Sequence, residues 1–367
     1  MGPLDGIKVL EFSGIGPGPF CGMILADLGA DVIRLSKDTQ KGYGNVKDVH
    51  NRSKKTITAD LKNPKVVEEI KKLIQQMDVV FEGFRPGVME KLGIGPEECL
   101  KINPKLIYGR MTGWGQKGPL SKTAGHDINY ISIAGVLNSI GRRDSNPIAP
   151  LNLIGDYGGG GMYLAVGILS AYINRLKTGE GQIIDSAMVD GSLSLMSFFY
   201  SLKQMDHWKN DRESNLLDGA AHFYDTYECA DNKFIAVGCL EQEFYEIFLT
   251  KLEINNKKFH DRMNSALWEE LKEIISKKIK SKTRNQWEDI FKNTDACVSP
   301  VLDMDEAIKH PHNSSRDAFI EIDNFIQPNA TPRFSNTPLK IKHNAKIIGS
   351  DNDSVCSEYQ LDKDLFS

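Results

Sequence analysis

His126 and Asp156 are the two side chains of this 367-residue chain whose chemistry suits proton transfer best. An imidazole and a carboxylate can both titrate near neutral pH once their surroundings are tuned, so such a pair can serve as acid and base. His126 lies in a loop before the apolar segment 131–137, and Asp156 precedes the glycines Gly158–Gly161 at the expected start of a long helix. A helix start offers unpaired N–H groups and a positive dipole end, which suits a negatively charged reaction intermediate.

A plainer interpretation of these residues is an N-cap aspartate and a hydrogen-bonded histidine with no catalytic role. The four glycines weigh against it, because each costs about 1 kcal/mol relative to alanine inside a helix. We therefore expect another group to approach the backbone closely after Asp156.

The turn Gly14–Pro19 follows an apolar strand and precedes a helix, as in dinucleotide-binding folds. The pattern is incomplete, because Cys21 occupies the third glycine position and Arg34 stands where an acidic residue would bind a ribose diol. A cation at that place suits a phosphate better. Other cations also follow expected strands, where the binding crevice of a parallel sheet lies; they are Lys37, Lys54, Lys55, Lys62, Arg85 and Lys91.

Strand-like and helix-like segments alternate from the N-terminus to about residue 190, which predicts an α/β domain with a parallel sheet. We expect one long helix over residues 155–177 and another over 188–203. Beyond a polar linker, a hairpin of strands 223–229 and 234–239 followed by helices predicts an α+β region. In the Asn/Pro-rich tail, residues 338–341 are strand-like.

Composition excludes several classes of protein. The 45 Lys+Arg residues are balanced by 49 Asp+Glu, so the chain lacks the basic excess of a nucleic-acid binder. No segment has the roughly 18 apolar residues of a membrane helix, and no signal peptide is recognisable. The six cysteines are far apart, which indicates free thiols in a reducing compartment, and no cluster has the spacing of a metal site. We expect an intracellular protein without a metal.

Three groups of motifs resemble one family. They are Gly125-His126-Asp127-Ile128-Asn129-Tyr130, then Leu151–Asp156 with Gly158–Gly161, and Ala236–Glu241. The segments 16–21, 85–90 and 295–298 strengthen the similarity, which runs from residue 1 to about 320. The sequence is similar to the alpha-methylacyl-CoA racemases, which form part of the family III CoA-transferase group.

This resemblance implies an interlocked homodimer whose active site lies between subunits. Each subunit would have a large Rossmann-like domain, residues 1–200 completed by about 320–367, and a smaller α+β domain, residues 215–315. By the same resemblance His126 and Asp156 are the two acid/base residues, and Glu241 sits beside His126 and favours its imidazolium form. The implied coenzyme A site consists of Arg34, Lys37, Ala59, Asp60, Leu61, Lys62, Gly83, Phe84, Arg85, Lys91, Gly125, Asp127, Ile128, Asn129 and Tyr130.

The implied activity is interconversion of (2R)- and (2S)-2-methylacyl-CoA thioesters by two-base proton transfer through an enolate. No cofactor is expected, because coenzyme A is part of the substrate, and neither nucleic acid nor membrane is an expected partner. One alternative is a family III CoA-transferase in which Asp156 attacks a thioester as nucleophile. Another is a non-catalytic acyl-CoA-binding protein, which would need none of His126, Asp156 and Glu241.

Two positions depart from the family pattern. His222 stands where a proline is usual, and we expect it near the acyl pocket. The segment 348–352 is a degraded form of a Gly-Glu-His-Thr motif, so the packing of the C-terminus is open. The sequence leaves open the physiological acyl chain and the choice among mitochondrion, peroxisome and cytoplasm.

Overall fold

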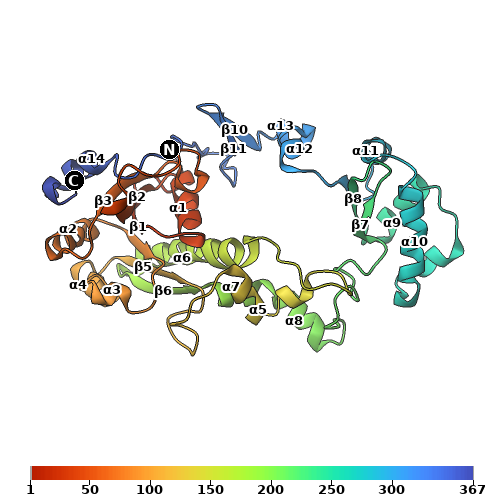
Figure 1. Ribbon diagram of the computed structural model, residues 1–367, viewed down its shortest axis with the longest axis horizontal. Coiled ribbons are helices and arrows are strands. Elements are labelled where there is room, and N and C mark those ends of the chain that lie inside the picture. Colours follow the sequence, from red (N-terminus) through yellow and green to blue (C-terminus); the bar gives the residue numbers. More distant parts are fainter. Residues whose placement is uncertain (1, 367) are drawn as a thin grey trace. The chain divides into compact units, whose positions relative to one another are not determined.

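The computed structural model describes residues 2–366 and contains two compact units. Unit 1 takes in the chain up to Val136, residues 150–196 and the residues from Ser315 onward, and unit 2 takes in residues 137–149 and 197–314. The domain boundaries drawn from the sequence stay a prediction. The elements of each unit are labelled in Figure 1.

Unit 1 is built on a six-stranded sheet in the order β3-β2-β1-β4-β5-β6, and every pair of neighbours is parallel. The predicted α/β class with a parallel sheet is therefore confirmed. The strands are β1 (Lys8–Phe12), β2 (Asp31–Lys37), β3 (Lys55–Ala59), β4 (Val79–Glu82), β5 (Ile107–Thr112) and β6 (Gln182–Ala187). The helices are α1 (Pro17–Asp27), α2 (Pro64–Gln75), α3 (Val88–Lys91), α4 (Pro96–Ile102), α5 (Asp127–Ile133), α6 (Tyr163–Thr178), α7 (Met188–Leu195) and α14 (Asn352–Tyr359).

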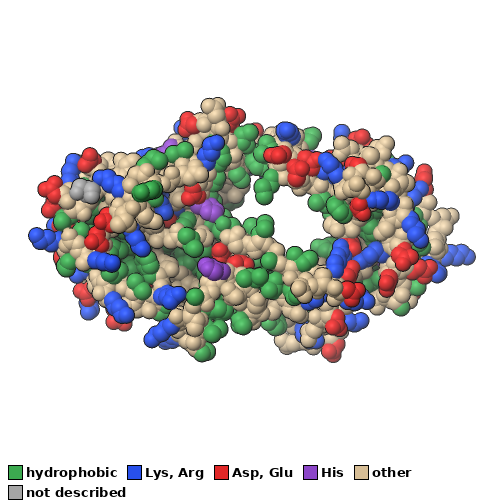
Figure 2. Space-filling view, in the orientation of Figure 1, with side chains coloured by type: hydrophobic (Ala, Val, Ile, Leu, Met, Phe, Trp, Pro, Cys, Tyr) green, Lys and Arg blue, Asp and Glu red, His purple; other side chains and the backbone are tan. Residues whose placement is uncertain are grey.

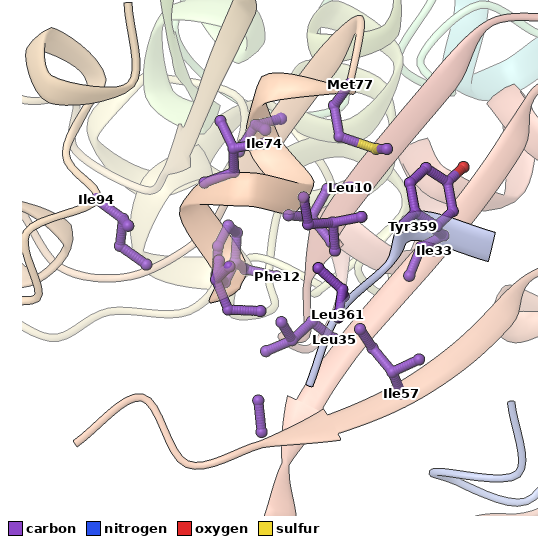
Figure 3. Packing of buried hydrophobic residues seen from close by; sticks show 14 of the residues in the cluster. Leu10, Phe12, Ile33, Leu35, Ile57, Ile74, Met77, Ile94, Tyr359 and Leu361 are labelled. Atoms are coloured by element: carbon purple, nitrogen blue, oxygen red, sulfur yellow. The ribbon is translucent and has the colours of Figure 1, made fainter. Parts of the chain in front are cut away.

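Successive residues of each strand pack into different cores, because side chains alternate across a sheet. Leu10 and Ile33 face a core completed by α2, α4 and α14, whereas their neighbours Val9 and Val32 face a core completed by α1 and α6. The sheet is thus buried on both faces, as parallel sheets usually are. Figure 3 shows the first of these cores.

The segment between β5 and α6 differs from the predicted single helix over residues 155–177. Residues Leu153–Met162 form a π-helix, η4, and the regular helix α6 begins only at Tyr163. Asp156 therefore lies inside a helix and not before its first turn. The predicted helix 188–203 is likewise two helices, α7 and α8 (Ser197–Gln204).

The C-terminal segment covers the edge strand β3. The carboxylate of Asp351 accepts a hydrogen bond from the Thr56 N–H at 2.9 Å, and the Asn352 amide oxygen accepts one from the Thr58 N–H at 2.9 Å. Side chains here supply the acceptors that a neighbouring strand would otherwise provide. Figure 3 shows that Tyr359 and Leu361 also extend the hydrophobic core beside β2. The segment that departs from the family motif therefore packs firmly.

Residues 338–341 form no strand in the described chain, contrary to the prediction. The tail instead contains an antiparallel hairpin, β10 (Phe319–Ile322) and β11 (Phe325–Pro328), joined by Asp323 and Asn324. Both turn residues have positive φ angles, 52° and 58°, as two-residue hairpin turns of the primed type require.

Unit 2 carries the three-stranded antiparallel sheet β7-β8-β9 and a separate hydrophobic core. Its strands are β7 (Tyr224–Glu228), β8 (Phe234–Gly238) and β9 (Val298–Pro300). Its other helices are α9 (Gln242–Lys251), α10 (Trp268–Ile279), α11 (Arg284–Phe291) and α12 (Met304–Lys309), and α13 (Pro311–Ser315) follows at the end of the unit. The predicted hairpin of residues 223–239 is present as β7 and β8.

His222 is fully buried in unit 2, and its expected place near an acyl pocket stays a prediction. Its Nε2 atom lies 2.7 Å from the Tyr245 hydroxyl, and its ring meets those of Phe223 and Phe259 edge-on. Burial lowers the pKa of His222 to about 3, so the imidazole is neutral at physiological pH and packs as an aromatic core residue.

Figure 2 shows acidic and basic side chains interspersed over the visible face. This distribution matches the net charge of −4 and gives that face no single-sign stripe for nucleic acid. Within residues 2–366, none of the helices combines the length and the apolar character that crossing a membrane requires.

We expect Asn352→Ala to lower the free energy of unfolding by about 2 kcal/mol, because a buried N–H of the edge strand loses its acceptor. Urea denaturation measures the effect. Asn45→Ala is the matched control, since it removes an exposed hydrogen bond to the Lys47 N–H and should change stability by less than about 0.5 kcal/mol. Equal midpoints for the two variants would show that the C-terminal segment does not stabilise the sheet edge.

Candidate active site

A cavity of about 660 Å³ lies at the carboxyl ends of β1, β4 and β5. The strand order reverses between β1 and β4, since β2 and β3 follow on one side of β1 and β5 and β6 on the other side of β4. Ligands of open α/β sheets bind at such a reversal. The lining includes Phe12, Gly14–Gly18, Phe81, Gly83–Pro86, Met111–Trp114, Ala124–His126, Tyr130, Asn152, Asp156, Tyr157 and Met188.

Asp156 reaches this cavity from η4. Its carboxylate accepts a hydrogen bond from the Asn152 amide at 3.1 Å and lies close to the backbone of Gly16. Burial raises the pKa of Asp156; the Asn152 hydrogen bond and the charge of His126 counteract this effect, and the charge of Asp127 adds to it. A carboxyl group with a raised pKa can hold and release a proton closer to neutrality.

The backbone donors expected to be free beside Asp156 are occupied. The Asp156 N–H donates to Oδ1 of Asp127 at 2.7 Å, and the Tyr157 N–H donates to the Asn152 carbonyl at 3.3 Å. The helical segment begins at Leu153, two residues before the predicted start, and Asp156 lies in its first turn, but the prediction of free donors at this place is wrong. The π-helix begins earlier in the chain, and its own turn and the Asp127 carboxylate take up these two donors.

His126 lines the same cavity and is the N-cap residue of α5. The Asn129 side chain accepts a hydrogen bond from the His126 N–H at 3.0 Å, which is one half of a capping box. The preceding loop is held by Tyr130, whose hydroxyl donates to the Gly125 carbonyl and whose ring meets Trp114 edge-on. The imidazole of His126 is exposed, and hydrogen bonds hold the backbone before and after this residue.

Two glycines make this loop possible. A Cβ atom on Gly113 would lie 2.0 Å from Cζ of Tyr130, and one on Gly125 would lie 2.8 Å from Cε1 of the same ring. Both distances are too short for any side chain. The structure therefore brings His126 and Asp156 to one cavity through tightly packed backbone, and the two groups interact electrostatically.

Part of the predicted coenzyme A site lines the cavity as well. Gly83, Phe84 and Arg85 form the loop after β4, and Glu82 fixes this loop by accepting the Phe84 N–H at 2.7 Å. Glu82 also accepts a hydrogen bond from Arg110 at 3.1 Å. Burial raises the pKa of Glu82 to about 7, so this buried carboxyl titrates close to physiological pH.

Other predicted residues do not line the cavity; they are Arg34, Lys37, the segment 59–62 and Lys91. Lys37 ends β2 and stands opposite Ala59 at the end of β3, so the segment 59–62 continues beside it. The Arg34 guanidinium donates to the Ser13 hydroxyl at 3.2 Å. Lys91 is exposed at the end of α3. Their role toward coenzyme A stays a prediction.

In the segment 127–130, two side chains are buried and two are exposed to solvent. Asp127 and Tyr130 are buried, at 7% exposure each, whereas Ile128 is 45% exposed and Asn129 caps the helix. Glu241 belongs to unit 2, where it is exposed at the N-cap of α9. Its pairing with His126 stays a prediction.

Two of the cations that follow strands are engaged elsewhere. Lys54 is buried and donates to Glu11 at 2.6 Å, and Lys55 bridges Asp31 and Glu358. They are paired structural residues and do not line the cavity. Among residues 2–366 no three His, Cys, Asp or Glu side chains are grouped so that they could hold a metal ion.

The profile of CoA-transferase family III matches residues 4–352. The chain belongs to this family. This family III protein is 45% identical to the alpha-methylacyl-CoA racemase of Mus musculus over 91% of its own length and 87% of that protein. It is 41% identical to the alpha-methylacyl-CoA racemase of Homo sapiens, with 98% and 94% covered. Its fold is similar to that of a CAIB/BAIF family protein from Brucella suis, with a TM-score of 0.85, 25% identity, and 98% and 99% of the two chains covered.

Sequence reasoning missed Trp114 and Tyr157 as lining residues of the family III protein. Trp114 follows β5 by two residues, so the rule that ligands bind beyond the carboxyl ends of strands could have found it. Tyr157 offered no such signal. Its ring packs against Phe20 and His50, with centroids 4.6 and 5.3 Å away, and this contact depends on the π-helix.

The glycines after Asp156 allow neighbouring helices to pack closely. A Cβ atom on Gly159 would lie 2.7 Å from the Ser192 nitrogen of α7, and one on Gly161 would lie 2.8 Å from the Pro17 carbonyl of α1. In turn, a Cβ atom on Gly191 would lie 1.9 Å from the Gly159 carbonyl. The expected close approach is real, but the approaching groups are helices α1 and α7.

We expect Gly191→Ala to lower the free energy of unfolding by about 2 kcal/mol or more, because the added methyl group forces α7 away from η4. Chemical denaturation measures the loss. Gly18→Ala is the control: Gly18 also lies in a helix, nothing is within 4 Å of its Cβ position, and alanine favours helices. If both variants are as stable as wild type, the glycine contact is not a constraint on the fold.

Proposed function

We propose that this family III protein is a racemase that interconverts (2R)- and (2S)-2-methylacyl-CoA thioesters. The observation that carries the proposal is the presence of an imidazole, His126, and a carboxylate, Asp156, on the lining of one cavity. The similarity to two alpha-methylacyl-CoA racemases, at 45% and 41% identity over nearly the whole chain, supports it.

The reaction needs two groups because a stereocentre inverts only when the proton leaves one face and another arrives at the opposite face. One group removes the proton next to the thioester carbonyl, the enolate forms, and the second group donates a proton to the other side. The two exchange roles in the reverse direction. General acid–base catalysis of this kind contributes about 10²–10⁴-fold in rate.

The remaining parts of the proposed site follow from this reaction. Arg85 and the cations Arg34, Lys37 and Lys62 would bind the phosphates of coenzyme A along the carboxyl edge of the sheet. Glu241 would stabilise the imidazolium of His126. The oxidation state of the substrate does not change, so the proposed reaction requires no redox cofactor, and coenzyme A enters as part of the substrate.

The second candidate is a CoA-transferase, in which Asp156 would attack the thioester and carry the acyl group as an anhydride. The family to which the chain belongs takes its name from this activity. His126 favours the racemase, because acyl transfer to the carboxylate needs no second proton-transfer group on the facing loop.

We expect the wild-type protein to exchange the α-proton of a 2-methylacyl-CoA with solvent, so that incubation in heavy water adds one deuteron per molecule. His126→Ala and Asp156→Ala should each slow the exchange by about 10²-fold or more, since each removes one of the two bases. Mass spectrometry of the thioester measures the uptake.

His260→Ala is the control, because His260 is an exposed histidine of unit 2 and its loss should leave exchange unchanged. Transfer of the acyl-CoA moiety to a second carboxylic acid without deuterium uptake would establish the transferase instead. Exchange that persists in both Ala variants would contradict the proposed roles.

We propose further that the protein is a homodimer, interlocked as the resemblance implies. Helix α6 is apolar on both sides: Leu164 and Ile168 are buried, whereas Val166 and Ile173 are each 55% exposed. A helix that is apolar all round is normally covered on all sides. Leu176 of α6 is exposed as well, and further exposed apolar residues on neighbouring elements of unit 1 are Leu153, Met162, Ile183, Leu193 and Leu195.

We expect Val166→Asp to shift the protein from dimer to monomer, because a charge would be buried without a partner at the interface. Sedimentation velocity measures the change. Met304→Asp, at an 83% exposed position on α12, should leave the assembly unchanged. A monomeric wild type at micromolar concentration would exclude the dimer.

A further inference from the structure

Asp127 is a buried carboxylate between the two proposed acid/base residues. It follows His126 in sequence, is only 7% exposed, and accepts the backbone N–H of Asp156 at 2.7 Å. The N–H of Gly155 also donates to it. A hydrogen bond from a backbone N–H to a carboxylate is charge-assisted and stronger than a neutral one. Asp127 therefore ties the turn that carries Asp156 to the start of α5.

The chain makes room for this contact at Gly155. A Cβ atom there would lie 2.5 Å from Oδ1 of Asp127 and 3.2 Å from a methyl carbon of Ile131. Any side chain at this position would push the carboxylate away from the Asp156 N–H. The absence of a side chain at Gly155 is thus required for the carboxylate to reach the backbone.

The second oxygen of Asp127, Oδ2, is buried and makes no hydrogen bond within the described chain. Its charge is therefore poorly compensated and acts on its neighbours. Burial raises the pKa of Asp156, and the charge of Asp127 adds to this effect. The pKa of Tyr130 is raised by burial, then by the charge of Asp156, and to a smaller extent by that of Asp127. A like charge nearby disfavours ionisation.

We propose that Asp127 is a positioning residue for Asp156: its carboxylate fixes the backbone of that residue and helps its side chain to hold a proton. This inference rests on the proposed racemase function. It gives the Asp127 side chain a role toward Asp156, whereas the resemblance places this residue in the coenzyme A site.

Among the groups that surround Asp156, Asp127 is the main source of negative charge. From α5 and the loop before it come His126, Asp127 and Tyr130. Helix α1 approaches with the backbone of Gly16, and α7 packs on η4 through Met188, an uncharged residue. Removal of the Asp127 charge should consequently change the titration of Asp156 in a known direction.

The test is the pH profile of α-proton exchange for Asp127→Asn and Asp127→Ala. The asparagine keeps an acceptor for the Asp156 N–H but removes the charge, so the pKa of Asp156 falls. The limb of the profile that reports Asp156 should move to lower pH by about half a unit or more. The shift has the same direction whether Asp156 acts as base or as acid, because in both cases the midpoint follows its pKa.

The alanine variant removes the acceptor as well. We expect its kcat to fall by about tenfold or more below that of Asp127→Asn, with KM changed by less than about twofold, because orientation of Asp156 is lost and binding is not. Asp185→Asn is the control: Asp185 is an exposed carboxylate that accepts the Gln116 N–H at 3.0 Å and lies outside the cavity lining. Its profile should match that of the wild type.

The possible outcomes separate the two proposals. An unshifted profile in Asp127→Asn together with an unchanged kcat in Asp127→Ala overturns the positioning role. A large rise in KM with unchanged kcat in both variants would make Asp127 a ligand contact and would also overturn it. If the wild-type protein shows no α-proton exchange, the proposed racemase function is rejected, and the positioning role of Asp127 is rejected with it.

Discussion

The proposed site depends on the direct contact between the backbones of η4 and α7. The Gly159 carbonyl lies where a side chain on Gly191 would have to be, so the two helices touch without intervening side chains. The π-helix has a wider turn than an α-helix and its neighbours must fit that shape. Because η4 is held between α1 and α7, Asp156 has a defined place relative to the strand ends.

Most of the fold could be predicted because apolar strand runs alternate with amphipathic helices, and this alternation indicates a parallel sheet. The hairpin β10–β11 was missed although its signal was present, since Asp323-Asn324 separates two apolar runs by two turn-forming residues. The edge interactions of Asp351 and Asn352 were beyond sequence reasoning. They are made by side chains that lie nearly three hundred residues from their partners in β3.

The identity of the proposed acid/base pair could be predicted, but its local geometry could not. The types of His126 and Asp156 are visible in the sequence, whereas the hydrogen-bond register of η4 is decided by helices that pack on it from elsewhere in the chain. The four glycines were correctly interpreted as a sign of close approach, but the sequence did not show that helices α1 and α7 approach them. Likewise the direction of the Asp127 side chain depends on Gly155, which lies 28 positions further along the chain and shows no link to it in the sequence.

The closure of the β3 edge by Asp351 and Asn352 has a consequence for biosynthesis. The strand is made within the first sixty residues, but the side chains that accept its edge N–H groups belong to the last twenty. During translation β3 is therefore made before any residue of unit 2, and its edge is not covered at that stage. Until residues 351 and 352 have been made, the nascent chain carries an uncovered strand edge that can pair with other extended chains, and molecular chaperones are the factors expected to bind it at this stage.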